Sequence, residues 1–396
     1  MSVRTGNRPP QAVELSVVMP CLNEADTLET CIRKAQQAML EHHIAGEVIV
    51  ADNGSSDGSQ AITLRTGARL VNVPAKGYGN ALMGGIRAAR GRFVIMGDAD
   101  DSYDFLEIPR IISKLREGFD LVQGCRLPAG GGKVMPGAMP FSHRWLGNPI
   151  FTFLVRRWFR ALSIHDVYCG LRGFSKDLYS RMQLRCTGME FATEMIIKAT
   201  LFGEKIAEVP ITLHPDGRRS HPPHLKTYRD GWRTLRFFLM YSPRWLFLIP
   251  GFVLVLFGLI GYSVAMPAFN WRGVTFDAHT LLVASLAILC GYQAIVFAIF
   301  TKTFAVNEGL LPADQYYTRF YRLLNLERGL GIAALALLFG LSLLGVAANQ
   351  WRMTGFGRLD YAHTMRLVVP GVTLTALGFQ TVMSSFFVSV LGMKRR

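Results

Sequence analysis

Cysteine is scarce in this chain. Only six cysteines occur among 396 residues, with no Cys-X-X-Cys pair and no His-rich ligand spacing around them. The simplest interpretation is a set of reduced core thiols in a cytosolic domain. Internal repeats and low-complexity segments are also absent, and residues 1–14 are polar and contain proline, so no signal peptide is predicted at the N-terminus.

Charge is scarce from Trp245 onward. Each of the long apolar runs there approaches the ~20 residues that cross a hydrocarbon core as a helix. Soluble helices of such length normally carry a charged face, and these runs have almost none. They predict four transmembrane spans, at Trp245–Met266, His279–Phe300, Gly329–Ala347 and Leu367–Leu391.

The loops between the spans predict their orientation. Cations concentrate between the second and third spans and in the Lys394–Arg396 tail, whereas the loop after the first span has only Arg272. The loop after the third span carries Arg352, Arg358 and Arg366, which weakens this bias without reversing it. Positive residues favour the cytoplasmic side. We therefore expect an integral membrane protein, located in the plasma membrane if the source is prokaryotic, with both termini and the N-terminal domain in the cytoplasm.

The formal net charge is +15. A basic chain can bind nucleic acid, but many of these cations crowd the segment just before the first span. There they attract anionic lipid headgroups at ~1 kcal/mol each. A lipid phosphate explains them better than DNA does, so we expect a membrane partner and no nucleic acid.

Residues 15–125 alternate short apolar strands with amphipathic helical segments. This alternation predicts an α/β fold with a mostly parallel sheet. Ligands of such sheets bind at the carboxyl ends of the strands. Polar residues follow several of these predicted strand ends, namely Asn23, Glu24, Asp52, Asp57, Asp98 and Asp100.

The segment Gly97–Tyr103 carries three acidic side chains within four residues, directly after an apolar strand. Such a concentration of negative charge is costly without a cation nearby. Carboxylates in this spacing suit a hard divalent metal that also binds phosphate oxygens. A solvated acidic loop is the alternative, because Asp-X-Asp alone is a weak motif.

Six segments in order resemble one known family. They are VVMPCLNE (17–24), VADNGSSDGS (50–59), GDADDSY (97–103), VQGCR (122–126), DVYCGLRGFS (166–175) and GMEFATEM (188–195). Together they resemble the family 2 glycosyltransferases, within them the polyprenyl-phosphate branch that includes dolichyl-phosphate mannose and glucose synthases. The resemblance covers roughly residues 14–245. It implies a Rossmann-like GT-A domain that moves a sugar from a nucleotide diphosphate onto a lipid phosphate.

The resemblance also implies roles for individual residues. Asp98 and Asp100 correspond to the pair that holds Mg²⁺ or Mn²⁺ on the donor diphosphate. The predicted contacts to the nucleotide sugar are Pro20, Asn23, Glu24, Asp52, Asp57, Asp98, Gln123 and Glu194. The predicted contacts to the acceptor phosphate are Arg126, Arg172, Arg218, Arg219 and Lys226.

Several of these assignments have structural alternatives. Asp166 is a catalytic candidate that orients the acceptor or pairs with Arg172, because an anionic lipid phosphate needs no general base. Arg126 binds phosphate or forms an ion pair with one of the acids. Glu190 and Glu194 lie on the same face of one helix. One of them is expected to contact the sugar, with Glu194 favoured, and the other to pair with Lys198. An Asx-type turn is the alternative for Asp52.

We expect four segments: an N-terminal tail (1–14), the catalytic domain (15–228), an amphipathic interfacial helix (229–244) and an all-α transmembrane domain (245–396). The predicted activity is inverting, metal-dependent transfer of glucose or mannose from a nucleotide sugar to undecaprenyl or dolichyl phosphate. A processive polysaccharide synthase and a non-enzymatic lipid-carrier translocator or scaffold are the alternatives. Oligomeric state stays open, a homo-oligomer included.

Overall fold

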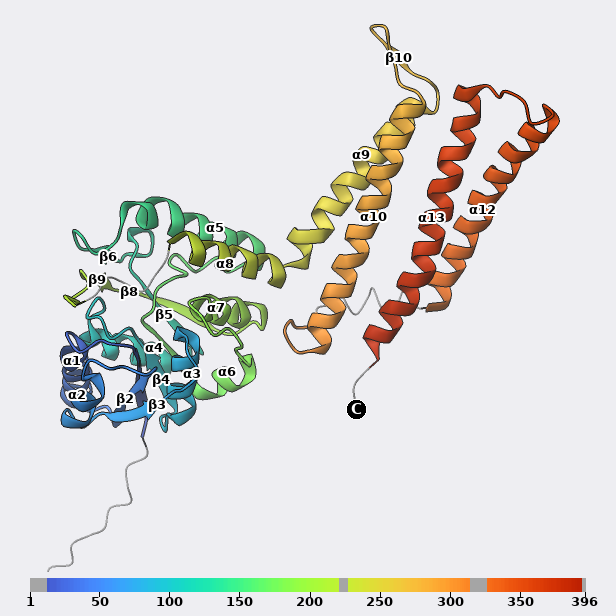
Figure 1. The fold of residues 1–396 in the computed structure, drawn as a ribbon. Coiled ribbons are helices and arrows are strands. Elements are labelled where there is room, and N and C mark those ends of the chain that lie inside the picture. The colour runs from blue at the N-terminus through green and yellow to red at the C-terminus, as the bar shows by residue number, and fades with distance from the viewer. Residues whose placement is uncertain (1–12, 221–226, 314–325, 394–396) are drawn as a thin grey trace, which may run out of the picture. The chain divides into compact units, whose positions relative to one another are not determined.

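The computed structural model describes residues 13–220, 227–313 and 326–393. Contacts between residues divide the chain into two compact units, Met1–Phe238 and Leu239–Arg396. The first contains a large sheet with helices on both faces, and the second is built almost entirely of long helices (Figure 1). Lys226, a predicted phosphate contact, lies outside the described residues.

The sheet of the first unit has seven strands in the order β3-β2-β1-β4-β7-β5-β8. All neighbouring pairs are parallel except those of β7, which runs antiparallel to both β4 and β5. This confirms the predicted mostly parallel α/β sheet. The strands are β1 Leu15–Cys21, β2 Gly46–Asp52, β3 Arg69–Asn72, β4 Phe93–Met96, β5 Leu121–Cys125, β7 Arg172–Ser175 and β8 Ile206–Pro210.

Strand β1 shows why this sheet forms. Its sequence is apolar apart from Ser16, as expected of a parallel strand covered on both faces. Leu15, Val17 and Met19 point into the main hydrophobic core, which they share with helices α1 (Leu28–Glu41) and α4 (Ile108–Arg116). Val18 points the opposite way, toward Gly85 of helix α3 (Tyr78–Ala88). Helices therefore cover both faces and leave the strand ends for polar residues.

Some elements of this unit were not predicted individually from the sequence, namely helices α2, α4 and α6 and strands β6 (Lys133–Val134) and β7. The strand expected over residues 205–213 is divided into β8 and the short β9 (Thr212–Leu213), which pairs with β6. The helices are α1 Leu28–Glu41, α2 Ser59–Arg65, α3 Tyr78–Ala88, α4 Ile108–Arg116, α5 Asn148–Phe159, α6 Lys176–Met182, α7 Phe191–Leu201 and α8 Thr227–Tyr241.

Helix α8 covers most of the segment predicted to lie in the headgroup plane. It buries Phe238 against two aromatic residues of α5, with ring centroids 5.8 Å from Phe151 and 6.0 Å from Phe159. Trp232 stays 61% exposed. The helix thus has one face anchored in the first unit, and its contact with a membrane stays a prediction.

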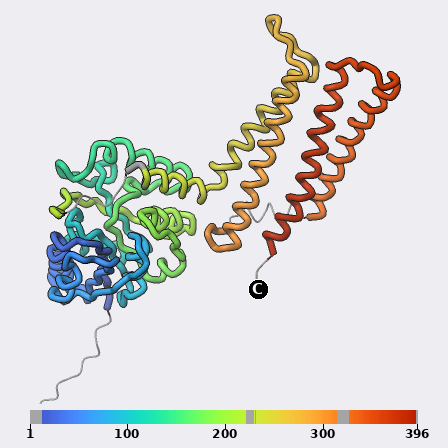
Figure 2. Tube along the Cα trace, in the orientation of Figure 1, coloured from blue at the N-terminus to red at the C-terminus, as the bar shows by residue number. Residues whose placement is uncertain are grey.

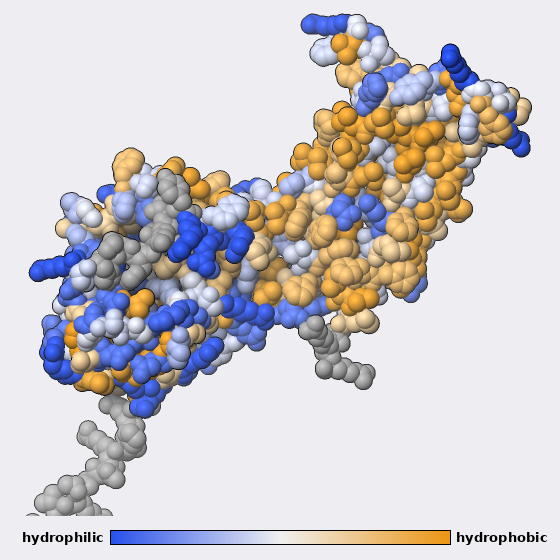
Figure 3. Space-filling model, in the orientation of Figure 1, coloured by the Kyte–Doolittle hydropathy of each residue, from blue (hydrophilic) through white to orange (hydrophobic). Residues whose placement is uncertain are grey.

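Among its described residues, the second unit contains four helices long and apolar enough to cross a membrane. The helices are α9 Ile249–Ala265, α10 Ala278–Asn307, α12 Leu326–Met353 and α13 Tyr361–Gly392. A π-helical turn at Arg244–Leu248 precedes α9, and a small hairpin of two strands (β10 Asn270–Trp271, β11 Val274–Thr275) connects α9 to α10. Helix α9 packs beside α10 and α12 beside α13, as the tube view shows (Figure 2). Apolar residues dominate the visible face of these helices (Figure 3). Length and composition thus mark the chain as an integral membrane protein.

Glycines let the paired helices approach closely. A Cβ atom on Gly291 of α10 would lie 2.6 Å from the carbonyl oxygen of Gly251 on α9. A Cβ on Gly340 of α12 would lie 2.8 Å from the carbonyl oxygen of Gly371 on α13. Small residues at such crossings are typical of helix packing in membranes, where the hydrophobic effect does not drive association.

Candidate functional site

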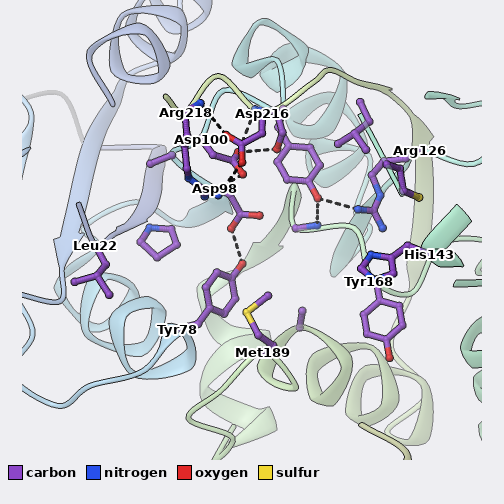
Figure 4. Close-up of a pocket in the computed structure, with 18 of the residues that line it drawn as sticks. Leu22, Tyr78, Asp98, Asp100, Arg126, His143, Tyr168, Met189, Asp216 and Arg218 are labelled. Atoms are coloured by element: carbon purple, nitrogen blue, oxygen red, sulfur yellow. Dashed lines mark hydrogen bonds and ion pairs between the residues drawn. The ribbon is translucent and has the colours of Figure 1, made fainter. Parts of the chain in front are cut away.

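A cavity of about 670 Å³ lies at the carboxyl ends of the strands of the first unit. Glu24 follows β1, Asn53 follows β2, Asp98 follows β4 and Arg126 follows β5, and all four line the cavity. Figure 4 shows acidic residues gathered with Arg218 at one end, and Arg126, His143 and Tyr168 at the other. The cavity therefore has an acidic end and a basic end.

Asp98 and Asp100 form the centre of the acidic end. Tyr78 Oη donates a hydrogen bond to Asp98 Oδ1 at 2.8 Å. Asp100 Oδ1 accepts from the Oγ of Ser102 at 2.6 Å and from its backbone N–H at 3.0 Å. The strand end and its following turn thus direct both carboxylates into the same cavity, as predicted from the sequence.

The environment of Asp98 opposes its negative charge. Burial, followed by repulsion from the Asp100 carboxylate, raises the pKa of Asp98 to about 7, although the bond from Tyr78 and the charge of Arg218 act in the opposite direction. Two carboxylates that share a buried site in this way ionise together only when a cation compensates them. The electrostatics therefore favour a cation at this end of the cavity.

The donor atoms fit Mg²⁺ or Mn²⁺. Both are hard ions that bind carboxylate oxygens, and Mg²⁺ typically takes one or two carboxylates and completes its shell with water and substrate phosphate. Among the described residues, no group of three or more His, Cys, Asp and Glu side chains is placed to enclose a metal. Asp98 and Asp100 would thus supply the protein ligands, and phosphate oxygens of a substrate the others.

Arg218 lies inside the acidic end. Its guanidinium bonds Glu24 Oε2 at 2.7 Å, Asp216 Oδ2 at 2.8 Å and Asp100 Oδ2 at 3.2 Å, and its side chain is 10% exposed. The sequence grouped Arg218 with the acceptor-phosphate contacts. In the structure it lies beside Asp100, because the loop after β9 folds back over this end of the sheet.

The neighbouring Arg219 has a different setting. Its backbone N–H donates to Asp26 Oδ2 at 2.9 Å. It does not line the cavity, whereas Arg218 does. The loop after β9 thus separates two adjacent arginines that the sequence had grouped together.

Arg126 marks the basic end of the cavity. Its Nε and Nη2 bond the two carboxylate oxygens of Asp166 at 2.7 and 2.8 Å, and its backbone N–H bonds Asp166 Oδ2 at 2.9 Å. Its Nη1 donates to the hydroxyl of Tyr103 at 3.3 Å. Asp166 is fully buried and does not line the cavity. The residue named as a catalytic candidate therefore acts here as the anchor of Arg126.

His143 lies near Arg126 on the turn before α5. Partial burial, then the positive charge of Arg126, hold the pKa of His143 below its ordinary value. The imidazole is therefore neutral at physiological pH. Apolar and aromatic side chains line the same end, including Met139, Phe151 and Tyr168. This end combines a fixed cation with an apolar wall.

Arg172 does not contribute to the cavity. It is fully buried on β7, and its guanidinium donates to the backbone carbonyls of Ala192 and Cys169. The predicted alternative of an Arg172–Asp166 pair is not formed, because Asp166 is occupied by Arg126. The assignment of Arg172 to the acceptor phosphate is therefore corrected to a role in packing, since no face of it reaches the cavity.

Glu194 and Gln123 are also buried away from the cavity lining. Glu194 Oε1 pairs with Lys198 Nζ at 2.9 Å, and both side chains have no exposed surface. The sequence left open which glutamate would pair with Lys198 and favoured Glu194 for the sugar, so this placement opposes that preference. Gln123 Nε2 donates to the carbonyls of Asp166 and Cys169 at 2.9 and 3.2 Å.

Of the remaining predicted nucleotide contacts, Pro20 and Glu24 line the cavity, whereas Asn23, Asp52 and Asp57 do not. Asp52 Oδ2 accepts from the backbone N–H of Gly54 at 3.0 Å, which is the Asx-type turn foreseen as its alternative. The Asp57 and Asn23 side chains join the first two strand-end loops through backbone N–H groups of Ala25 and Ser56.

Sequence reasoning missed several residues that line the cavity: Asn53, Lys76, Tyr78, Tyr103, His143, Tyr168, Met189 and Asp216. One local signal was present for Tyr78. It stands between Gly77 and Gly79 at the start of a predicted helix, and such glycines mark a close approach of backbone. The others come from loops whose meeting depends on the fold.

Comparison with known proteins identifies the family. Residues 16–182 match the family described as Glycosyl transferase family 2, and residues 299–392 match the Glycosyltransferase family 2 C-terminal transmembrane region. The low-salt glycan biosynthesis hexosyltransferase Agl6 of Haloferax volcanii is 37% identical over 382 residues, which cover 96% of this chain and 90% of that protein.

Two further similarities are more distant. The dolichyl-phosphate hexose transferase of Haloferax volcanii is 28% identical over 50% of this chain and 82% of its own length. A solved structure of glucosyl-3-phosphoglycerate synthase from Mycobacterium tuberculosis, in complex with Mn²⁺, UDP and glucosyl-3-phosphoglycerate, is 23% identical with a TM-score of 0.45, over 58% of this chain and 79% of that one.

The resemblance predicted over residues 14–245 is thus confirmed, and the similarity extends beyond it into the long helices. Agl6 matches along almost the whole length, and the two family regions fall separately on the sheet-containing unit and on the long helices. The chain belongs to glycosyl transferase family 2, as a glycosyltransferase with a GT-A-like domain and a C-terminal transmembrane region.

Proposed function

We propose that this glycosyltransferase transfers a single hexose from a nucleotide diphosphate sugar to a polyprenyl phosphate, with inversion at the anomeric carbon. The observation that carries the proposal is the division of one cavity into an acidic end with Asp98 and Asp100 and a basic, apolar end with Arg126. A nucleotide diphosphate with its metal suits the first, and a lipid phosphate suits the second.

The chemistry needs few reacting groups from the protein. The bond between the anomeric carbon and the donor diphosphate breaks, the nucleoside diphosphate leaves with the electron pair, and an oxygen of the lipid phosphate forms the new bond. A lipid phosphate is already anionic, so no general base has to remove a proton. This agrees with Asp166, which is fully committed to Arg126.

At the acidic end, Asp98 and Asp100 would hold Mg²⁺ or Mn²⁺. When bound, such an ion stabilises the negative charge that develops on the departing diphosphate. Arg218 bonds Asp100 Oδ2 at 3.2 Å. We assign it to the donor diphosphate, since a charged group fixed beside the leaving oxygens stabilises the same developing charge.

At the basic end, Arg126 would hold the acceptor phosphate. Asp166 fixes two of its nitrogens, which leaves Nη1 as the guanidinium nitrogen turned toward Tyr103. A guanidinium fixed in this way is pre-organised for a phosphate oxygen. The adjacent apolar side chains of Met139 and Phe151 suit the first isoprene units of a lipid.

The nature of the two substrates rests on the relatives and on the membrane helices. The closely matching Agl6 is named a hexosyltransferase, and a more distant relative a dolichyl-phosphate hexose transferase. These names favour a hexose donor and a polyprenyl acceptor, and glucose and mannose are the preferred candidates for the hexose. The distribution of cations between the spans favours a catalytic unit on the cytoplasmic face.

Membranes that contain the full chain, incubated separately with radiolabelled UDP-glucose and GDP-mannose, test this function. Addition of undecaprenyl or dolichyl phosphate should increase the label in a short, lipid-soluble product. The product should carry one phosphate, because the lipid keeps its own and the donor diphosphate departs intact. Membranes with the Asp100→Asn variant supply the matched control.

Two results would overturn the proposal. Label in a long polymer would favour a processive synthase. A complete lack of incorporation over a panel of nucleotide sugars, with wild-type chain confirmed in the membrane, would favour a binding or translocating role.

A further inference from the structure

Tyr78 fixes the orientation of Asp98. Its hydroxyl donates to Asp98 Oδ1 at 2.8 Å (Figure 4). On the other side of the carboxylate, Asp98 Oδ2 lies so close to Gly170 that a Cβ atom there would be 2.6 Å away. One oxygen is therefore held by a hydrogen bond while the other packs over a glycine, and rotation of the carboxylate is restricted on both sides.

Tyr78 is itself fixed by a backbone contact. The amide of Gly79 donates to the carbonyl oxygen of Thr187 at 2.9 Å. A Cβ atom on Gly77 would lie 2.5 Å from this same oxygen, and one on Gly79 would collide with the carbonyl of Cys186. Only glycines allow this approach. The first turn of α3 is therefore seated on the loop that precedes α7.

A buried ion pair holds that loop in place. Glu194 Oε2 accepts from the backbone N–H groups of Arg185 and Cys186 at 2.9 and 2.8 Å. Lys198, paired with Glu194 Oε1, donates to the carbonyls of Met182 and Gln183 at 3.0 and 2.9 Å. The two charges have no exposed surface. Both side chains also form hydrogen bonds with the backbone of one loop. Such additional hydrogen bonds offset the cost of burying an ion pair.

We propose that Tyr78 is a positioning residue for Asp98, and that the Glu194–Lys198 pair acts on the same carboxylate through the loop 182–187 and Tyr78. The inference rests on the proposed function, in which Asp98 is a metal ligand. Hydrogen-bond partners of a metal ligand orient it, and their loss typically costs 10–100-fold in metal affinity or activity. Glu194 thus serves the donor site from a buried position that never contacts the sugar.

Binding of Mn²⁺ to the detergent-solubilised full chain tests the role of Tyr78. The electron paramagnetic resonance signal of free Mn²⁺ reports the bound fraction, with UDP and GDP added in parallel samples. Tyr78→Phe keeps the ring and removes only the hydroxyl, and we expect Mn²⁺ affinity to fall about tenfold or more. Tyr361→Phe, which alters an exposed tyrosine of α13 that does not line the cavity, should leave affinity unchanged.

A merely structural role is distinguished by two further readouts. Thermal melting of Tyr78→Phe should resemble that of Tyr361→Phe, and the KM for the lipid phosphate should stay at its wild-type value while kcat falls. Equal Mn²⁺ affinity in wild type and Tyr78→Phe would overturn the positioning role alone. Wild-type chain that retains no Mn²⁺ with either nucleotide would overturn the metal assignment of the proposed function, and this inference with it.

A double-mutant cycle tests the connection to Glu194. Glu194→Gln should weaken Mn²⁺ binding, and Tyr78→Phe/Glu194→Gln should bind no more weakly than the weaker single variant, because both changes act on one carboxylate. Fold-changes that multiply would overturn the connection. If Glu194→Gln does not fold, Glu194→Gln/Lys198→Met replaces it in the cycle. This double variant removes both buried charges and keeps a hydrogen-bond acceptor for the loop, and the expected result is the same.

Discussion

The guanidinium of Arg126 is bound by both carboxylate oxygens of Asp166, at 2.7 and 2.8 Å, within a loop that also bonds the Asp166 carboxylate to the Arg126 backbone. The pair joins the end of β5 to the segment before β7, which are 40 residues apart in sequence. Asp166 thereby determines the direction of a cation at the basic end of the cavity.

Arg126→Lys should impair binding of the acceptor specifically. A lysine keeps the charge but loses the planar fork that Asp166 holds. A hydrogen bond to a charged group contributes ~1.5 kcal/mol or more, so we expect the KM for polyprenyl phosphate to rise about tenfold. Steady-state kinetics with each substrate varied in turn measure this change. Arg116→Lys, at an exposed ion pair with Glu14, is the matched control, and an equal rise in the KM for the nucleotide sugar would contradict the assignment.

Asp166→Asn should destabilise the first unit. Removal of one partner from a buried ion pair leaves the other charge uncompensated, at a cost of about 3 kcal/mol or more. The Arg126 side chain is only 10% exposed, so water has little access to the guanidinium to replace the lost carboxylate. Chemical denaturation of the full chain in detergent, followed by far-ultraviolet circular dichroism, would show the loss, whereas wild-type stability would refute it.

Asp100→Asn should abolish metal-dependent transfer without affecting membrane insertion. A bound ion supplies several kcal/mol of stabilisation to the departing diphosphate, which corresponds to a rate loss of roughly 1000-fold. Incorporation of label into lipid at saturating Mg²⁺ measures it. Asp101→Asn is the control, since Asp101 faces Lys34 at 2.8 Å and does not line the cavity. Unchanged turnover in Asp100→Asn would remove Asp100 from the reaction.

His143 should make stability depend on pH. Burial and the charge of Arg126 lower its pKa in the folded state. Below the unfolded-state pKa of about 6.5, the unfolded chain binds a proton at this histidine more readily than the folded chain does. The free energy of unfolding therefore falls as the pH falls. The advantage of wild type over His143→Gln in melting temperature should thus shrink between pH 7.5 and 5.5. An advantage that grows toward acid would show that the imidazole gains stability by protonation.

Gly291→Ala should weaken the pairing of α9 with α10. The added methyl group would meet backbone atoms of Gly251 and Val255 at 2.6 and 2.8 Å, and backbone cannot move aside as a side chain can. Overpacking of this kind costs about 1–3 kcal/mol. Gly331→Ala on α12, with no atom within 4 Å of the new Cβ, should be neutral or stabilising. Equal melting temperatures for the two variants in detergent would contradict the close packing.

The sequence predicted those features that depend on local pattern. Runs of apolar residues identified the strands and all four long helices, because strand and span lengths are limited by backbone rise and bilayer thickness. It also predicted that Asp98 and Asp100 share one cavity, since both follow the same buried strand and the carboxyl ends of parallel strands gather ligands. Strand β7 was missed because its four residues carry little pattern.

Side-chain partners were decided only by tertiary structure. From spacing alone, Asp166 could orient the acceptor or pair with Arg172, and Arg126 could bind phosphate or one of the acids. Glu194 could likewise face the sugar or pair with Lys198. Which contact forms depends on loops that meet after the sheet is assembled, such as the loop that brings Arg218 to Asp100. Local sequence therefore determined the strands, the membrane helices and the two aspartates, whereas long-range packing decided which buried charges neutralise one another, because unpaired charge in a protein interior is too costly to persist.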